Sequence, residues 1–303
     1  MHTIEFPDTK LKRYLPCDLS ECDQPQYIDM CELIFHYQNA SISYDEFRTH
    51  AVYKLLNMKR KKSKNEFEDE QKFCNVYMIS ELIDSFFEES KEVKKTIKQY
   101  YIHNPVPSFK PVWRTYYGPS DSFMNMTFGE YRDALRLFLD FHATGEANLL
   151  YLLAAVFYRP KKTFHFIKKR LVKYDGDIRE PYNSHSLEQR ADALKRAPIG
   201  FIYGFFLLFA SFQKYISSAK IMWGGQEIDF SILFATTTDQ EPATTTKVPG
   251  IGMDSIAFSM AESGAFGSMK EVDHTNFWQI MIRMYDLRRT DLEQQKHDAN
   301  VTN

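Results

Sequence analysis

The feature of the sequence that most limits its fold is a run of seventeen uncharged residues, Ala197 to Gln213. A helix over this run would be hydrophobic on almost every side, so either protein or lipid must enclose it. A bilayer span needs about 20 apolar residues, whereas this run is shorter and contains one proline and two glycines. We therefore predict a helix over Ile199–Ser217 that the rest of the chain buries, and a membrane-inserted helix is the alternative.

A repeated pattern predicts what packs around that helix. The segments Gln26–Tyr37 and Glu130–Phe141 match at an offset of 104 residues. A short loop, a second apolar helix and a basic stretch follow each segment. We predict two duplicated helical hairpins, at about 19–62 and 126–162. The alternative is that the hairpins are unrelated, because helical periodicity alone makes the apolar positions of any two amphipathic hairpins match to this extent. The shared residues are Tyr27/Tyr131, Asp29/Asp133 and Leu33/Leu137, with apolar residues at 31/135, 34/138, 35/139 and 37/141.

Local signals place the other elements. Ser43-Tyr-Asp-Glu46 and Thr127-Phe-Gly-Glu130 have the spacing of a capping box, which marks the start of a helix. Apolar periodicity predicts helices at 26–37, 67–88, 146–158, 187–196, 255–262 and 276–294. The predicted fold class is mainly α, with duplicated helical hairpins packed around a buried central helix. Four prolines and seven aromatic residues between positions 100 and 126 predict a Pro/aromatic-rich irregular insertion.

Composition divides the chain into three predicted parts. Residues 1–235 would form a helical domain that contains both hairpins. Residues 236–248 are rich in threonine and poor in apolar side chains, which is typical of a linker. Residues 249–303 would then form a C-terminal helical module.

Charge and motifs argue against several classes of function. The chain has 38 Lys and Arg against 40 Asp and Glu, so its net charge of −2 creates no overall field to attract nucleic acid or anionic membranes. The usual phosphate-binding, metalloprotease and serine-nucleophile motifs are absent from the sequence. We therefore predict that the protein is not an enzyme and has no catalytic residue, metal site or cofactor. We also expect that it binds neither nucleic acid nor a membrane.

The cysteines and the N-terminus predict an intracellular protein. The first residues lack the basic and apolar regions of a secretion signal, so the thiols should stay reduced. The spacing of Cys17 and Cys22 is looser than that of a zinc knuckle, so we favour apolar packing over zinc binding. The four cysteines are Cys17, Cys22, Cys31 and Cys74.

Two basic stretches, at 59–64 and 159–173, have more than one interpretation. They could contact phosphates, but both follow the second helix of a hairpin, where cations oppose the negative end of the helix dipole. We favour a solvated helix face or a patch for an acidic partner, and nucleic-acid binding is an alternative. The residues of this basic patch are Lys59, Arg60, Lys61, Lys62, Lys161, Lys162, Lys168, Lys169 and Arg170.

The last predicted helix carries a stripe of large apolar residues. Such a stripe can pack into a core or offer anchors to a partner. Core packing is the ordinary outcome, but the position after a predicted linker favours a partner-binding role. The stripe consists of Phe277, Trp278, Met281, Met284 and Tyr285.

Three short segments resemble tail-morphogenesis proteins of tailed bacteriophages. These segments are Leu152–Lys161, Ala261–Gly267 and Thr275–Tyr285. They are similar to the tail assembly chaperone-like proteins that are encoded near the tape-measure protein, especially in phages of Bacteroidetes. Together they cover under a tenth of the chain, and none contains a residue that chemistry requires.

The resemblance implies a non-enzymatic role in phage tail assembly. The expected partners are the apolar helices of the tape-measure protein or the tail-tube subunits, and the expected location is the host cytoplasm. Many such chaperones are much shorter than 303 residues, so a permanent structural component of the tail, neck or baseplate is the alternative. A nucleic-acid-binding protein that uses the two basic stretches is the second alternative.

Overall fold

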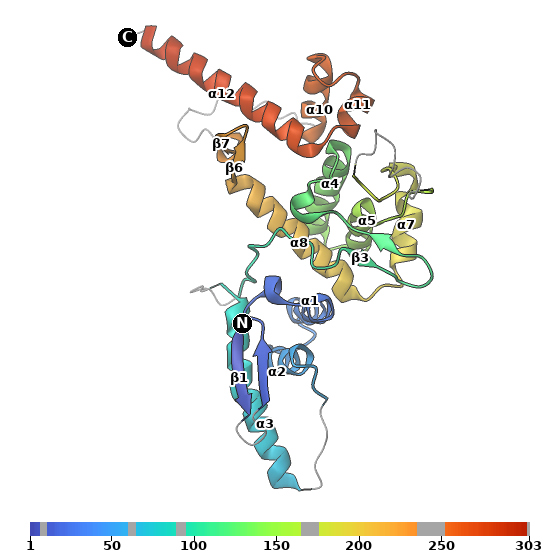
Figure 1. Ribbon diagram of the computed structural model, residues 1–303, viewed down its shortest axis with the longest axis vertical. Helices are drawn as coiled ribbons and strands as arrows, with labels where there is room; N and C mark the ends of the chain where they lie inside the picture. The colour runs from blue at the N-terminus through green and yellow to red at the C-terminus, as the bar shows by residue number, and fades with distance from the viewer. Residues whose placement is uncertain (7–10, 60–64, 89–94, 165–175, 235–251, 302–303) are drawn as a thin grey trace.

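The computed structural model describes residues 1–6, 11–59, 65–88, 95–164, 176–234 and 252–301 (Figure 1). Most of these residues are helical, which confirms the mainly α fold class. The helices are α1 (Gln24–Gln38), α2 (Tyr44–Leu55), α3 (Glu66–Ser80), α4 (Phe128–Thr144), α5 (Ala147–Phe157), α7 (Leu187–Leu194), α8 (Ile199–Ser218), α9 (Ser231–Phe234), α10 (Met253–Glu262), α11 (Met269–His274) and α12 (Phe277–Val301). The predicted helix at 67–88 is divided between α3 and a 3-10 turn, η2 (Glu81–Phe86).

Small antiparallel sheets lie at the edges of the helical body. Two of them are hairpins that the sequence analysis missed, and the second turns at Gly224-Gly225, where both residues have positive φ angles of 57° and 83°. A Gly-Gly pair between alternating residues is a signal for such a turn. The sheets are β1 (His2–Phe6) with β2 (Leu11–Leu15), β3 (Ser108–Phe109) with β4 (Tyr116–Tyr117) and β5 (Arg159–Pro160), and β6 (Lys220–Trp223) with β7 (Gln226–Asp229).

Helix α8 is the centre of the fold. It is long and apolar enough to cross a membrane, but 72% of its most apolar window is buried inside the protein. Figure 1 shows α8 running between α1 on one side and α4 and α5 on the other. The prediction of a helix buried by the rest of the chain is therefore confirmed.

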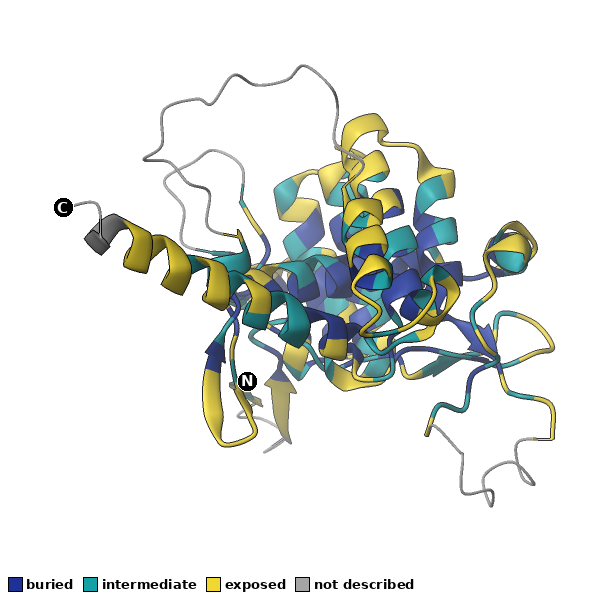
Figure 2. Cartoon of the chain, turned by 90° about the horizontal axis from the view of Figure 1, so that it is seen from above, coloured by how far each residue is buried: buried dark blue, intermediate teal, exposed yellow. Residues whose placement is uncertain are grey.

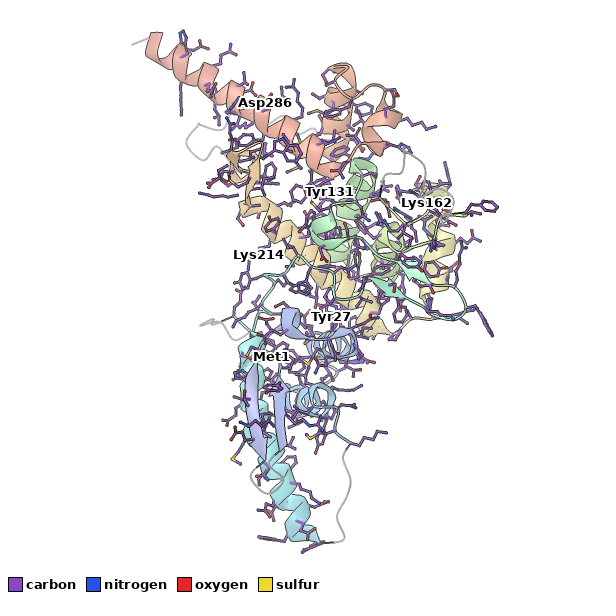
Figure 3. All side chains as sticks on the ribbon, viewed as in Figure 1. Met1, Tyr27, Tyr131, Lys162, Lys214 and Asp286 are labelled. Carbon is purple, nitrogen blue, oxygen red and sulfur yellow. The ribbon has the colours of Figure 1, made fainter. Side chains whose placement is uncertain are left out.

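Both predicted hairpins form pairs of neighbouring helices, α1 with α2 and α4 with α5. Ser43 and Thr127 form the predicted capping boxes with Glu46 and Glu130, because each pair exchanges hydrogen bonds between side chain and backbone. The matching tyrosines of the two repeats, Tyr27 and Tyr131, are both buried and both bind α8 through their hydroxyls (Figure 3). The shared tyrosine thus attaches each hairpin to the central helix, whereas the shared aspartates bind Lys54 and Tyr182.

The proline-rich insertion is ordered by burial of its aromatic and apolar side chains. Tyr101, Val106, Tyr116 and Phe123 are all buried, while Trp113 at the turn between β3 and β4 is 89% exposed. The Tyr101 backbone exchanges hydrogen bonds of 3.1 and 2.6 Å with the Ser211 hydroxyl on α8. The insertion therefore packs on the central helix, and its only helical part is the 3-10 turn η3 (Asp121–Phe123).

The C-terminal helices pack on the same body. Helix α11 contacts α4, and α12 contacts both α4 and α9. Figure 2 shows that α12 is buried at its start and exposed over its second half, where it projects from the body. The predicted linker at 236–248 lies outside the described residues.

Candidate functional site

The predicted partner-binding stripe begins inside the protein. Phe277, Trp278 and Met281 are 0%, 5% and 3% exposed. The Phe277 ring centroid lies 4.3 Å from that of Tyr131, and the Trp278 indole N–H donates to the carbonyl of Ser122 at 3.2 Å. These three side chains therefore pack in the core, against apolar residues of α4 and α8. Only the last two residues of the predicted stripe, Met284 and Tyr285, are not fully buried.

Those two residues, Met284 and Tyr285, are half-buried at the point where α12 leaves the body. Tyr285 lines a groove of 440 Å³ between α12 and the β6–β7 hairpin. Trp223 from β6 forms part of the opposite wall and remains 49% exposed. The apolar residues of this surface, named here the α12 groove, are Trp223, Ile228, Phe266, Ile282 and Tyr285.

Three of the four charges on the rim of the α12 groove pair with each other, and Glu227 pairs with Lys220 beside the groove. Asp286, which is labelled in Figure 3, accepts hydrogen bonds from Arg283 at 2.8 Å and from Arg289 at 3.3 Å. Glu227 adds a second carboxylate to the lining, so two acidic and two basic side chains surround the apolar walls. A ligand of this groove would therefore be selected mainly by apolar contact.

A cluster of buried charges lies under the start of α4, and the sequence analysis did not foresee it. Glu130, Arg159 and Arg179 are at most 2% exposed. Arg159 donates to the Glu130 carboxylate, and Arg179 lies 3.6 Å from the same group. Asp177 accepts a hydrogen bond from Arg179 at 2.8 Å and lies 3.6 Å from Arg159. Glu130 thus completes its capping box and also neutralises buried arginine.

The pKa values in this cluster shift in the directions that its geometry requires. Burial lowers the pKa of Arg159, and the neighbouring Glu130 carboxylate opposes that change. Burial alone would raise the pKa of Asp177, but hydrogen bonds and positive charge from Arg179 outweigh burial and lower it. Two guanidinium groups therefore face two carboxylates, and the cluster joins β5 and the 177–179 segment to the start of α4.

A polar cavity of 460 Å³ opens above the cluster. Its wall includes Tyr182, whose hydroxyl donates to Asp133 at 2.5 Å. Burial and that carboxylate raise the pKa of Tyr182, so the phenol stays protonated and is a poor nucleophile. Within the part of the chain that the structure describes, no three His, Cys, Asp or Glu side chains lie together as metal ligands. Five charged residues of its lining already have partners in the fold, namely Glu130, Asp133, Arg159, Asp177 and Arg179.

The basic patch is only partly described. Arg60, Lys61, Lys62, Lys168, Lys169 and Arg170 lie outside the described residues. Lys59 is exposed after α2, and Lys161 is exposed after β5. Lys162, labelled in Figure 3, lines the polar cavity. The described ends of the two basic stretches therefore belong to different hairpins.

The four cysteines are free thiols. Cys22 and Cys31 are buried, and burial raises the pKa of both thiols, so neither is a reactive thiolate. Cys74 on α3 is exposed and Cys17 is half-buried.

The surfaces of the described residues include the apolar α12 groove and a polar cavity over buried ion pairs, on a helical fold. No protein-family model, curated protein or solved structure matches the chain.

Proposed function

We propose that the chain is a non-catalytic binding protein of phage tail morphogenesis, which holds an amphipathic helix of another tail protein in the α12 groove. The observation that carries the proposal is the groove itself: its walls are apolar, and one of them is a helix whose first turns are fixed in the core. A wall held in this way loses little conformational freedom when a ligand binds.

The shape and chemistry of the α12 groove favour a helical ligand. A volume of 440 Å³ between one helix and a short hairpin can accept several side chains from one face of an amphipathic helix. Trp223 and Tyr285 are the residue types that most often dominate the energy of such interfaces. Met222, 68% exposed next to Trp223 on β6, extends the apolar surface beyond the groove.

The resemblance of Thr275–Tyr285 to tail assembly chaperone-like proteins supports a tape-measure protein as the ligand, because that segment contributes to the wall of the groove. Tape-measure proteins are long and helical, so they offer amphipathic segments that need cover during assembly. The alternative is a permanent structural component of the tail, neck or baseplate, which would use the same groove. It differs from an assembly chaperone because it would be retained in purified particles.

The test is a binding measurement on the full chain with the tape-measure protein of the same phage. Trp223→Ala and Tyr285→Ala should each weaken binding by about tenfold or more, as expected for anchor residues at an interface. Trp113→Ala is the matched control, because Trp113 is 89% exposed at the distant β3–β4 turn and its removal should leave binding unchanged.

A stability measurement separates this groove from the core beside it. Trp278→Ala should lower the free energy of unfolding by about 3–5 kcal/mol, because a buried aromatic side chain is lost. Trp223→Ala should change that free energy little, since half of the side chain is exposed. Unchanged binding by both groove variants would refute the proposal.

A further inference from the structure

The polar cavity above the buried ion pairs has paired carboxylates and unpaired basic groups in its lining. Each of its four carboxylates contacts an arginine or a tyrosine of the fold. Among the described residues, the side chains of Lys270 and His185, which also line the cavity, form no hydrogen bond or ion pair. The chain therefore neutralises the acidic groups of the cavity itself and leaves an ammonium and an imidazole for a ligand. The four carboxylates are Glu130, Asp133, Asp177 and Asp273.

The lysine and histidine side chains of the lining come from separate segments of the chain. Lys270 and His274 lie one turn apart on α11, and His185 lies in the 3-10 turn η4 (Ser184–Ser186). Lys162, which Figure 3 labels, follows β5. A ligand that contacts these groups must therefore present acceptors in more than one direction.

The floor of the cavity also favours negative charge. Arg159 is 2% exposed, and its Nε–H has no hydrogen-bond partner among the described residues, although its other nitrogens contact Glu130 and Asp177. A buried donor without an acceptor is uncommon and calls for an explanation. Thr127 and Gly129, at the start of the 17-residue helix α4, line the same cavity, so the positive end of the helix dipole faces it.

We propose that the polar cavity binds a phosphate group, held between α11 and η4 above the start of α4. The oxygens of a phosphate point in several directions, so it accepts from donors on separate segments, whereas a carboxylate presents two oxygens in one plane. Lysine ammonium groups and the positive ends of helices are both common phosphate ligands. The paired carboxylates of the lining do not oppose such a ligand strongly, because neighbouring groups of the fold already balance them.

The phosphate group has two possible sources, inorganic phosphate and a phosphomonoester. The volume of 460 Å³ falls within the range of sites that bind small organic molecules, about 300–1,000 Å³. Inorganic phosphate would leave part of this volume to water, and an ester would fill more of it. The relative affinities of the two compounds therefore identify the source.

A bound phosphate group would join α11, one of the C-terminal helices, to η4 and the start of α4. A ligand that binds only the folded chain raises the stability of the fold. The polar cavity and the α12 groove share no residue, so this inference does not depend on the proposed function. Failure of one experiment leaves the other unaffected.

The first test is a calorimetric titration of the full chain with inorganic phosphate and, separately, with β-glycerol phosphate. Sodium chloride keeps the ionic strength constant, so that general screening of charge does not change. The wild-type chain should bind at least one of the two compounds. Lys270→Ala should weaken binding by about tenfold, because a charge-assisted bond is lost, and His185→Ala should weaken it by about threefold. Tighter binding of the ester would assign the site to an organic phosphate, and equal affinities would assign it to free phosphate.

Lys195→Ala is the matched control. Lys195 is exposed at the end of α7, pairs with Asp192 at 2.7 Å and does not line the cavity. Its removal should leave the affinity unchanged. The side chains of Lys270 and His185 are also exposed, so circular dichroism should show the same folded state for all three variants.

Thermal unfolding provides a second measurement. Phosphate stabilises many proteins without binding to a site, so the informative quantity is the difference between variants. Phosphate should raise the Tm of the wild-type chain and of Lys195→Ala more than that of Lys270→Ala, because only the last variant lacks a ligand of the phosphate group.

Three results would overturn the proposal. The first is a wild-type chain that binds neither compound. The second is an affinity that Lys270→Ala and His185→Ala both leave unchanged, and the third is an equal rise in Tm for the wild-type chain and Lys270→Ala.

Discussion

The two helical hairpins share a sequence pattern, yet they pack on α8 in different ways. Helix α1 crosses α8 at Gly200 and Gly204, where a Cβ atom would lie 2.1 Å from the Ile28 carbonyl oxygen and 2.7 Å from the Tyr27 ring. Helices α4 and α5 instead meet the opposite side of α8 through aromatic rings. The first hairpin therefore depends on close backbone approach, and the second depends on side-chain volume.

The aromatic contact involves both helices of the second hairpin. Phe209 of α8 has its ring centroid 5.4 Å from that of Phe138 on α4 and 5.8 Å from that of Phe157 on α5. Phe206 stacks on Phe138 at 5.2 Å. The central helix thus has a small-residue side and an aromatic side, and each hairpin fits one of them.

Two matching positions of the hairpins also differ in charge. In the first hairpin, the side chain of Gln26 donates a hydrogen bond of 2.8 Å to the carbonyl of Leu55. At the offset of 104 residues, the corresponding positions are Glu130 and Arg159, which form the buried ion pair. In both hairpins, a residue at the start of the first helix thus bonds to the residue at the end of the second helix. The bond is neutral in the first hairpin and an ion pair in the second. A buried charge makes the second hairpin more sensitive to the loss of one partner.

The largest expected effect comes from breaking the ion pair. Arg159→Met should lower the free energy of unfolding by about 3–5 kcal/mol, because it leaves Glu130 buried without its closest counter-charge. Urea unfolding monitored by circular dichroism measures the change. Adding Glu130→Gln should recover part of the loss, since the second repeat then carries the neutral residue of the first. A loss below about 1 kcal/mol for Arg159→Met would mean that the pair contributes no more than a surface pair.

A smaller effect is expected from filling the glycine contact. Gly200→Ala should destabilise the protein by about 3 kcal/mol, at the upper end for overpacking, because a backbone carbonyl obstructs the new methyl group. Gly204→Ala is the matched variant and should cost less, about 2 kcal/mol, since the new methyl group meets side chains, the Tyr27 ring and the Cys31 sulfur, rather than a backbone carbonyl, and alanine favours the helix. Equal costs at the two positions in urea unfolding would contradict the close backbone approach.

The smallest effect distinguishes the neutral repeat from the charged one. Gln26→Ala removes the bond to Leu55 and half of the capping box with Asp23. Neither lost bond involves a buried charge, so the expected loss is about 1 kcal/mol. Comparison with Arg159→Met under the same conditions tests whether burial of charge is what separates the hairpins. A loss as large as that of Arg159→Met would remove the distinction.

The sequence by itself determined the helical class, the buried central helix and the starts of the hairpin helices. Each of these features depends either on residues within four positions of each other or on a long run of apolar residues. Both kinds of signal can be recognised directly in the sequence. Ser43 and Thr127, for example, are recognised as helix caps from the glutamates that follow them. The Gly224-Gly225 turn has a local signature of the same kind, because both glycines adopt positive φ angles.

Only the tertiary structure decided the roles that depend on distant partners. Whether Trp278 faces the core or a ligand depends on surfaces from α8 and from the insertion, which are far away in the chain. Glu130 acquired a second role because Arg159 and Arg179 converge on it from two later segments. Such convergence has no local signature, since the chain must fold before these charges meet and lose their water.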